Sequence, residues 1–403
     1  MAKTVVILGA LDTKGKDFAF VRHLFEQHGL RTLVIDFGVL GGPAFTPDID
    51  RARVAAVGGG DLAALRSGRR KDEAMRVMAA GVSRLVRQLY ETGQLDGIFS
   101  MGGGSGTSIA TAAMRALPLG VPKLMVSTLA GGDVTTYAGG KDIVFFPSVV
   151  DVAGLNQVSR TAYTRAAHAL MAMMQAEVLP AEGDRPLIAA SMFGNTTPCV
   201  ERARFQIEPY GYEVLIFHAT GTGGRSMESL IEDRYCVACL DLTTTELADE
   251  VCGGVFSAGP QRCLAAARAG IPTVLAPGCV DMANFWGIGT LPIRYRERTL
   301  YQWNPNVTLL RTNVEENARI GEMLAAAANA SVGPVAILLP LRGVSMLDSP
   351  GGAFWDPEAD RACFEAIKRC LRPGVPVIEL DHNINDTAFA DQAAATLLAM
   401  LNR

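Results

Sequence analysis

The chain has 403 residues, of which 49% are hydrophobic, and this size and apolar content exclude a disordered chain and predict two or three domains. Lys and Arg number 37 against 41 Asp and Glu, so the formal net charge of −4 argues against general nucleic-acid binding. Two short basic clusters, residues 66–71 and 293–298, are interpreted as solvated surface.

Short apolar strands alternate with amphipathic helices along the first half. In chain order the sequence predicts a strand at 4–10, a helix at 16–29, a strand at 31–38, a helix at 72–92, a strand at 96–101, a helix at 107–117 and a strand at 122–128. Strand, helix and strand in succession without hairpin signals are typical of βαβ units and a parallel sheet.

The charged, Pro- and Gly-containing stretch LPAEGDRP, at residues 179–186, is predicted to be a linker. The pattern restarts after it: residues 6–42 and 188–224 align without a gap at an offset of 182. Gly29 then falls on Gly211. The identities are few, so duplication and shared fold physics both stay open.

We therefore predict an α/β protein with two Rossmann-like parallel-sheet subdomains in tandem, at residues 1–180 and 186–403. The second ends with strands inside 334–347 and 375–381, a helix between them at about 357–371, and a last helix at 386–401.

The stretch MGGGSGT, residues 101–107, stands between a predicted strand and a predicted helix. In open parallel sheets ligands bind outside the carboxyl ends of the strands, where this stretch lies. Its glycines let backbone N–H groups converge on a phosphate, the helix N-terminus adds its dipole, and Ser105 and Thr107 add hydroxyls. The alternative is a tight turn with a capped helix, for which one or two glycines would suffice.

Spacing excludes the two best-known phosphate cradles. A P-loop needs GxxxxGK[ST], but Ala10 stands where the first glycine belongs and Asp17 where Ser or Thr belongs. The Rossmann GxGxxG fails at Thr107, and no acidic residue ends a strand near 126, so NAD is disfavoured.

The other candidates follow neighbouring strands. Lys14 can neutralise the charge of a phosphate, and Asp12 can hold Mg²⁺ directly or through water. Asp36 can accept a hydrogen bond from a ribose hydroxyl. An ordinary Asx-type turn is the alternative at 12–14. Asp133 and Lys141 are weaker candidates that could be loop charges. The predicted nucleotide site comprises Gly9, Asp12, Thr13, Lys14, Asp36, Gly102, Gly103, Gly104, Ser105, Gly106, Thr107, Thr128, Gly131 and Gly132, with Asp12 as the metal candidate.

The second half carries its own polar loops, typical of a pocket of mixed polarity. The residues that could bind an organic acid or transfer protons are His218, Arg225, Glu228, Asp281, Asn284 and Arg342. Arg225, Glu228 and Asp281 are the catalytic candidates. Neither a G-x-S-x-G elbow nor HExxH is present, and no nucleophile can be named. An enzyme acting on a small carboxylate or sugar acid in catabolism is therefore the alternative to a nucleotide-binding protein.

Cysteine usage predicts a reducing compartment. Of eight cysteines only Cys236 and Cys239 form a CxxC, in a strand-like context, so we expect buried thiols. No apolar run has signal-peptide form or reaches about 18 residues. We therefore expect a cytoplasmic protein without a membrane partner.

Several long motifs together resemble one family. They are VILGALDTKG, DGIFSMGGGSGTSIAT, MVSTLAGGDV, DVAGLNQVSR, HATGTGGRSME and RGVSMLDSPGGAFWDPEAD. The chain resembles, from about residue 3 to 400, the ATP-binding domain family of the tomato mosaic virus resistance protein. The resemblance implies two Rossmann-like subdomains, ATP or a related nucleotide with Mg²⁺ in the N-terminal one, and a homodimer. The viral partner of the plant protein is not carried over. A binding or regulatory role is favoured, and ATP turnover stays open.

Overall fold

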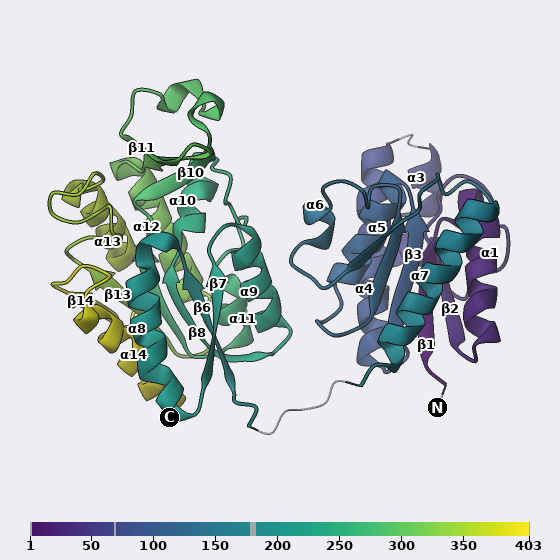
Figure 1. The fold of residues 1–403 in the computed structure, drawn as a ribbon, viewed down its shortest axis with the longest axis horizontal. Coiled ribbons are helices and arrows are strands. Elements are labelled where there is room, and N and C mark those ends of the chain that lie inside the picture. Colours follow the sequence, from purple (N-terminus) through teal and green to yellow (C-terminus); the bar gives the residue numbers. More distant parts are fainter. Residues whose placement is uncertain (1, 68–69, 178–182, 403) are drawn as a thin grey trace. The chain divides into compact units, whose positions relative to one another are not determined.

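The computed structural model describes residues 2–67, 70–177 and 183–402. The chain divides into two compact units, residues 1–180 and 181–403 (Figure 1). The middle of the predicted linker, residues 178–182, lies outside the described residues. Each unit holds a parallel sheet covered by helices on both faces, so the α/β prediction with two parallel-sheet units is confirmed.

The first unit has five parallel strands in the order β2-β1-β3-β4-β5. Its elements are β1 (Thr4–Gly9), α1 (Leu11–Gln27), β2 (Arg31–Asp36), α2 (Arg51–Val57), α3 (Leu62–Ser67), α4 (Lys71–Glu91), β3 (Gly97–Gly102), α5 (Gly104–Arg115), β4 (Lys123–Ser127), α6 (Thr135–Ala138), β5 (Val144–Pro147) and α7 (Gln157–Gln175).

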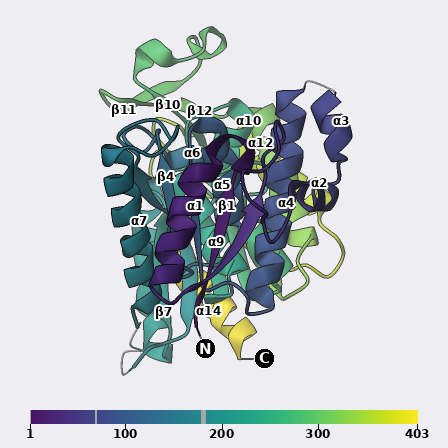
Figure 2. The same cartoon turned by 90° about the vertical axis from the view of Figure 1, so that its right-hand side faces the viewer.

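Alternating side chains of β1 divide the core of this unit into two layers. Val5 and Ile7 face α1 and α7, whereas Val6 and Leu8 face α2, α4 and α5 (Figure 1 and Figure 2). All four side chains are fully buried. Because helices cover both faces of the sheet, the sequence of β1 is a continuous apolar run rather than an alternation of apolar and polar residues.

Two helices begin earlier than predicted. The helix expected from residue 16 starts at Leu11, with a break in helical geometry at Lys14, and the helix expected from 107 starts at Gly104. The first turn of a helix needs no i−4 partner for its N–H groups, so poor helix formers cost little there. The consequence is that only Gly103 separates β3 from α5.

The second unit repeats the same topology with additions. Its elements are β6 (Leu187–Met192), α8 (Thr197–Ile207), β7 (Glu213–His218), α9 (Thr222–Glu232), β8 (Cys236–Thr243), α10 (Thr245–Cys252), α11 (Leu264–Ala269), β9 (Thr273–Gly278), β10 (Met282–Trp286), β11 (Leu300–Asn304), β12 (Val307–Arg311), α12 (Val314–Asn329), β13 (Val335–Pro340), α13 (Pro357–Cys370), β14 (Val377–Leu380) and α14 (Thr387–Leu401), with short 3₁₀ turns at 194–196, 208–210, 288–290 and 293–295.

Its parallel sheet runs β7-β6-β8-β9-β13-β14, which is the first unit's order plus one strand. The offset of 182 carries β2 onto β7 residue for residue, and Gly29 and Gly211 both take positive φ, of 77° and 87°. Helices α8 and α14 pack on one face, while α10, α12 and α13 pack on the other.

A small antiparallel sheet, β10-β12-β11, has no counterpart in the first unit and was not predicted. The basic cluster at 293–298 leads into it. Arg298 pairs with Glu316 at 2.7 Å and lies over the Tyr295 ring, so this arginine is structural rather than solvated. Among the described helices, none has the length and apolarity needed to cross a membrane.

Candidate functional site

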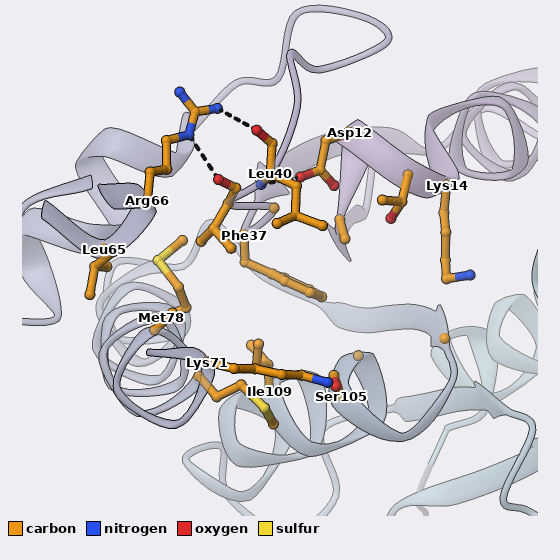
Figure 3. A pocket seen from close by; sticks show the side chains of 18 of the residues that line it. Asp12, Lys14, Phe37, Leu40, Leu65, Arg66, Lys71, Met78, Ser105 and Ile109 are labelled. Atoms are coloured by element: carbon orange, nitrogen blue, oxygen red, sulfur yellow. Dashed lines mark hydrogen bonds between the residues drawn. The ribbon is translucent and has the colours of Figure 1, made fainter. Parts of the chain in front are cut away.

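A cavity of about 690 Å³ opens at the carboxyl edge of the first sheet. The helices that follow β1 and β3 pack on opposite faces, so the strand order reverses between these neighbours and leaves a crevice there. The lining residues come from the segments at the ends of β1, β2 and β3 and from α1, α3, α4 and α5 (Figure 3): Ala10, Asp12, Thr13, Lys14, Phe37, Gly38, Val39, Leu40, Leu65, Arg66, Arg70, Lys71, Ala74, Met75, Met78, Met101, Gly102, Ser105, Gly106 and Ile109.

The end of β3 and the N-terminus of α5 contribute one wall through Gly102, Ser105 and Gly106. None of the glycines at 102–106 has positive φ, so backbone conformation does not require them. A Cβ added to Gly104 would meet nothing within 4 Å, whereas one on Gly102 would lie 3.2 Å from the Gly106 Cα. These glycines therefore keep the first-turn backbone bare beside the cavity.

Asp12 connects the cavity to the segment that follows β2. Its Oδ2 accepts from the N–H groups of Leu40 at 2.7 Å and Gly41 at 3.2 Å, and Arg51 lies 3.8 Å away. Its Oδ1 accepts no hydrogen bond from the residues that the structure describes. Lys14 also lines the cavity (Figure 3), but its ammonium donates to the Val152 carbonyl.

Asp36 does not line the cavity. Its fully buried carboxylate accepts from the N–H groups of Leu11 at 3.1 Å and Gly38 at 2.9 Å and lies 3.0 Å from Arg51. Burial raises the pKa of Asp36. The structure therefore gives Asp36 a role in joining β1, β2 and α2 instead of the predicted ribose contact.

Other predicted ligands are also outside the cavity wall. A Cβ on Gly9 would come within 2.7 Å of the Phe18 ring, so Gly9 serves packing. The buried Thr107 hydroxyl pairs with that of Ser127 at 2.7 Å, which ties α5 to β4. The remaining residues outside the lining set are Gly103, Gly104, Thr128, Gly131, Gly132 and Lys141. Asp133 caps the turn at 135, accepting from the Thr135 N–H at 2.8 Å.

In the second unit, the catalytic candidate Glu228 belongs to a buried ion-pair network. Arg262, with no exposed side-chain area, contacts Asp241 at 2.5 Å, Glu246 at 2.6 Å and Glu228 at 3.2 Å. Glu228 also accepts from the backbone N–H groups of Cys263 and Ala265, both at 2.7 Å. Burial raises the pKa of Glu228. Every observed contact of this carboxylate is structural.

Glu246 of the same network occupies the helix start that follows β7. Its Oε1 accepts from the N–H groups of Gly221 at 2.6 Å and Gly224 at 3.1 Å. An internal carboxylate thus fills an anion-binding position at the N-terminus of α9, while the N-terminus of α5 in the first unit borders an open cavity.

Asp281 lies in a second buried cluster, with Asp348, Asp360 and Arg311. Arg311 contacts Asp360 at 2.7 Å and Asp348 at 3.6 Å, and the Ser345 hydroxyl donates to Asp281 at 2.8 Å. Burial, reinforced by Asp348, raises the pKa of Asp281 to about 7.

The remaining second-unit candidates are dispersed. Arg225 donates to the Ser257 carbonyl at 2.9 Å, and Asn284 binds Asp249 at 2.7 Å. His218 is exposed against the Phe193 ring, and Arg342 forms an exposed pair with Asp381. The six candidates do not form one constellation. Over the described part of the chain, no group of three or more His, Cys, Asp or Glu is arranged to hold a metal ion.

Comparison with known proteins shows which family the chain is related to. Residues 3–178 match the N-terminal domain, and residues 185–401 the C-terminal domain, of the family described as Uncharacterised protein family (UPF0261). The chain belongs to this family. A UPF0261 protein of Clostridium tetani is 46% identical over 404 residues, which is 100% of both chains.

The tomato ToMV resistance protein Tm-1(GCR237) is 36% identical to this UPF0261 member over 332 residues, which cover 81% of this chain and 44% of the tomato protein. The predicted family resemblance is therefore confirmed. Among solved structures, a UDP-N-acetylglucosamine 2-epimerase from Rickettsia bellii matches with a TM-score of 0.23 and 11% identity over 100% of this chain and 96% of that one.

Sequence reasoning missed part of the cavity in this UPF0261 protein. Arg66, Arg70 and Lys71 line it, although the cluster at 66–71 was interpreted only as solvated surface. Residues 68–69 lie outside the described residues. The apolar wall of Met75, Met78 and neighbours was also missed. The amphipathic pattern of 72–92 was visible, but nothing local indicated that the start of α4 faces the start of α5.

Proposed function

We propose that this protein binds ATP or a closely related nucleotide in the cavity of its first unit and has a binding or regulatory role. The observation that supports this most is the cavity itself. It lies at the switch point of a parallel sheet, it has the volume of small-molecule sites, and it is lined mainly by apolar side chains with a few polar groups.

The lining divides into two parts that suit the two ends of a nucleotide. Ser105 and the bare backbone at 102–106 offer N–H and hydroxyl donors to phosphate oxygens. Met75, Met78 and Ile109 offer a polarizable apolar wall that favours a nucleobase. We propose that the phosphates lie toward α5 and the base toward α4.

Mg²⁺ would enter with the nucleotide. Mg²⁺ is usually held by one or two carboxylates together with substrate phosphates rather than by a protein cage. Asp12 fits this requirement, since it lines the cavity and its Oδ1 is not used by the described residues. Its Oδ2 already holds the segment after β2, so Asp12 has a structural task as well.

We propose a binding role over the alternative of an enzyme with its active site in the second unit, because the contacts of Arg225, Glu228 and Asp281 are separate from one another. We retain the homodimer and the cytoplasmic location as proposals. The eight cysteines are free thiols, seven of them buried, which agrees with a reducing compartment.

The proposal is tested by titrating ATP with Mg²⁺ into the full chain by calorimetry. Gly106 lines the cavity, and a bulky residue there has room, because an added Cβ comes no closer than 3.8 Å to the Met101 carbonyl oxygen. Gly106→Leu should therefore fold and weaken ATP binding at least tenfold by crowding the phosphates.

Gly289→Leu is the matched control, because Gly289 lies in the second unit and a Cβ there meets nothing within 4 Å. It should bind ATP as the unaltered chain does. Absence of any heat with ATP, ADP or GTP would refute nucleotide binding. Equal affinity of both variants would refute the placement of the phosphates.

A further inference from the structure

We propose that Lys71 binds the phosphate of the ligand in the first-unit cavity and so makes the site selective for phosphorylated ligands. This inference rests on the proposed nucleotide site and deepens it, because it names the side chain that separates a phosphorylated ligand from an uncharged one. Lys71 stands at the first position of α4, in the cluster that the sequence suggested to be plain surface.

The geometry directs this side chain into the cavity. Lys71 lines it together with Ser105 of α5. Figure 3 shows the Lys71 stem running from α4 across the cavity, with its ammonium pointing toward the Ser105 hydroxyl. The ammonium thus points toward the wall that carries the bare backbone of α5.

The other cations of the lining are already engaged. Lys14 donates to the Val152 carbonyl, and Arg66 donates to the carbonyls of Val39 at 2.8 Å and Gly41 at 2.9 Å. Arg70, which precedes α4, pairs with Asp72 and Glu73 in the first turn of that helix. Lys71 makes neither a hydrogen bond nor an ion pair with any residue in the described ranges.

No carboxylate of the lining is placed to neutralise Lys71. Asp12 is the acidic residue of the lining, and its Oδ2 is taken by the N–H groups of Leu40 and Gly41. A lysine ammonium is a compact, flexible charge that gains from phosphate oxygens. Lys71 is exposed and has no carboxylate partner in the lining, so its ammonium is available to a ligand phosphate, which would lie between Lys71 and the start of α5.

The test measures affinities of the full chain for ATP, adenosine and inorganic pyrophosphate by calorimetry. Lys71→Met keeps the unbranched apolar stem of the side chain and removes the ammonium. ATP and pyrophosphate should bind about tenfold or more weakly, while adenosine affinity stays within twofold. Lys71→Arg should recover most of the ATP affinity. Arg76→Met is the matched control, because Arg76 is exposed on the same helix and does not line the cavity.

The outcomes separate this inference from the proposed function. If Lys71→Met binds ATP as the unaltered chain does, or loses adenosine affinity equally, Lys71 does not read charge and nucleotide binding still stands. If the unaltered chain binds pyrophosphate in a Lys71-dependent manner but binds neither ATP nor adenosine, the anion role stands and the nucleotide assignment fails. If neither ATP nor pyrophosphate binds, both fail.

Discussion

Single residues decide whether the backbone N–H groups at a helix start are left uncovered or are bonded within the fold. The glycines at 102–106 and Arg262 illustrate the two cases. In the first unit, glycines that need no special φ leave backbone uncovered beside a cavity. In the second unit, Glu246 covers the backbone N–H groups of Gly221 and Gly224, and Arg262 neutralises that carboxylate. One arrangement leaves room for an anion from outside, while the other supplies the anion from the chain.

The second arrangement makes Arg262 a stability residue. Arg262→Met would leave the buried Asp241 and Glu246 and the half-buried Glu228 without their counter-charge. Removing one partner of a buried ion pair costs about 3–5 kcal/mol, so the free energy of unfolding of the second unit should fall by about that amount. Trp286, Trp303 and Trp355 all lie in the second unit, so tryptophan fluorescence during urea unfolding measures it.

Arg342→Met serves as the control for this prediction. Arg342 pairs with Asp381 on the surface, and exposed pairs contribute little to stability. Its urea midpoint should stay close to that of the unaltered chain. If both variants shifted the midpoint equally, the buried network would not be the reason.

At the scale of elements, β12, α13 and the segment between β13 and α13 contact one another through a cluster of charged side chains. Arg311 of β12 contacts Asp360 of α13 and Asp348 of the connecting segment. Burial and the neighbouring Asp348 raise the pKa of Asp360 to about 9. One arginine cannot compensate three buried carboxylates, so the folded chain holds protons that an unfolded chain releases near pH 4.

The stability of the second unit should therefore fall as pH rises. The folded pKa of Asp281 is raised to about 7 and that of Asp360 to about 9, from an ordinary value of 3.8. A raised carboxyl pKa stabilises the fold fully below the unfolded pKa, and this contribution is lost as pH rises through the folded pKa. Urea unfolding followed by tryptophan fluorescence from pH 5 to 9.5 should show the decline.

Asp360→Asn should flatten this pH dependence, because it removes one of the groups that titrate. Asp381→Asn is a suitable comparison, since Asp381 is exposed and its pKa is lowered by Arg342 rather than raised. A slope unchanged by Asp360→Asn would show that the cluster does not govern the pH response.

At the scale of the whole molecule, two sheets whose first five strands share one order differ in what lies at their carboxyl edges. The first unit has the candidate cavity at this edge, and the second unit has the additional strand β14 and the small antiparallel sheet. Ligand binding should therefore protect one unit only.

Hydrogen exchange of the full chain with saturating ATP and Mg²⁺ should locate the protection. Amides in residues 10–14, 37–41 and 101–109 should exchange more slowly, because a ligand at 100 times its dissociation constant stabilises the bound form by about 2.7 kcal/mol. Residues 187–380 should exchange as in the free protein. Protection confined to the second unit would contradict the assignment.

Much of the fold follows from local pattern. The apolar runs of β1 and β3, the amphipathic stretch of α4 and the repeat of Gly29 at Gly211 are signals within short windows, and they were sufficient for two parallel-sheet units. The antiparallel sheet was missed because β10, β11 and β12 are short and lie among irregular segments. Family membership also followed from sequence, because its motifs are long.

The sequence by itself determined the alternation of strands and helices, the tandem halves and the Gly-rich stretch at a strand end, because these depend on neighbouring residues. Only the tertiary structure decided which polar residues face a cavity. Asp36 is fully buried and Glu228 is half-buried, and both are bonded within the fold, while Lys71 points across a cavity toward Ser105. The physical reason is that a side chain's partner is set by packing between distant segments, which residue type and spacing do not encode locally.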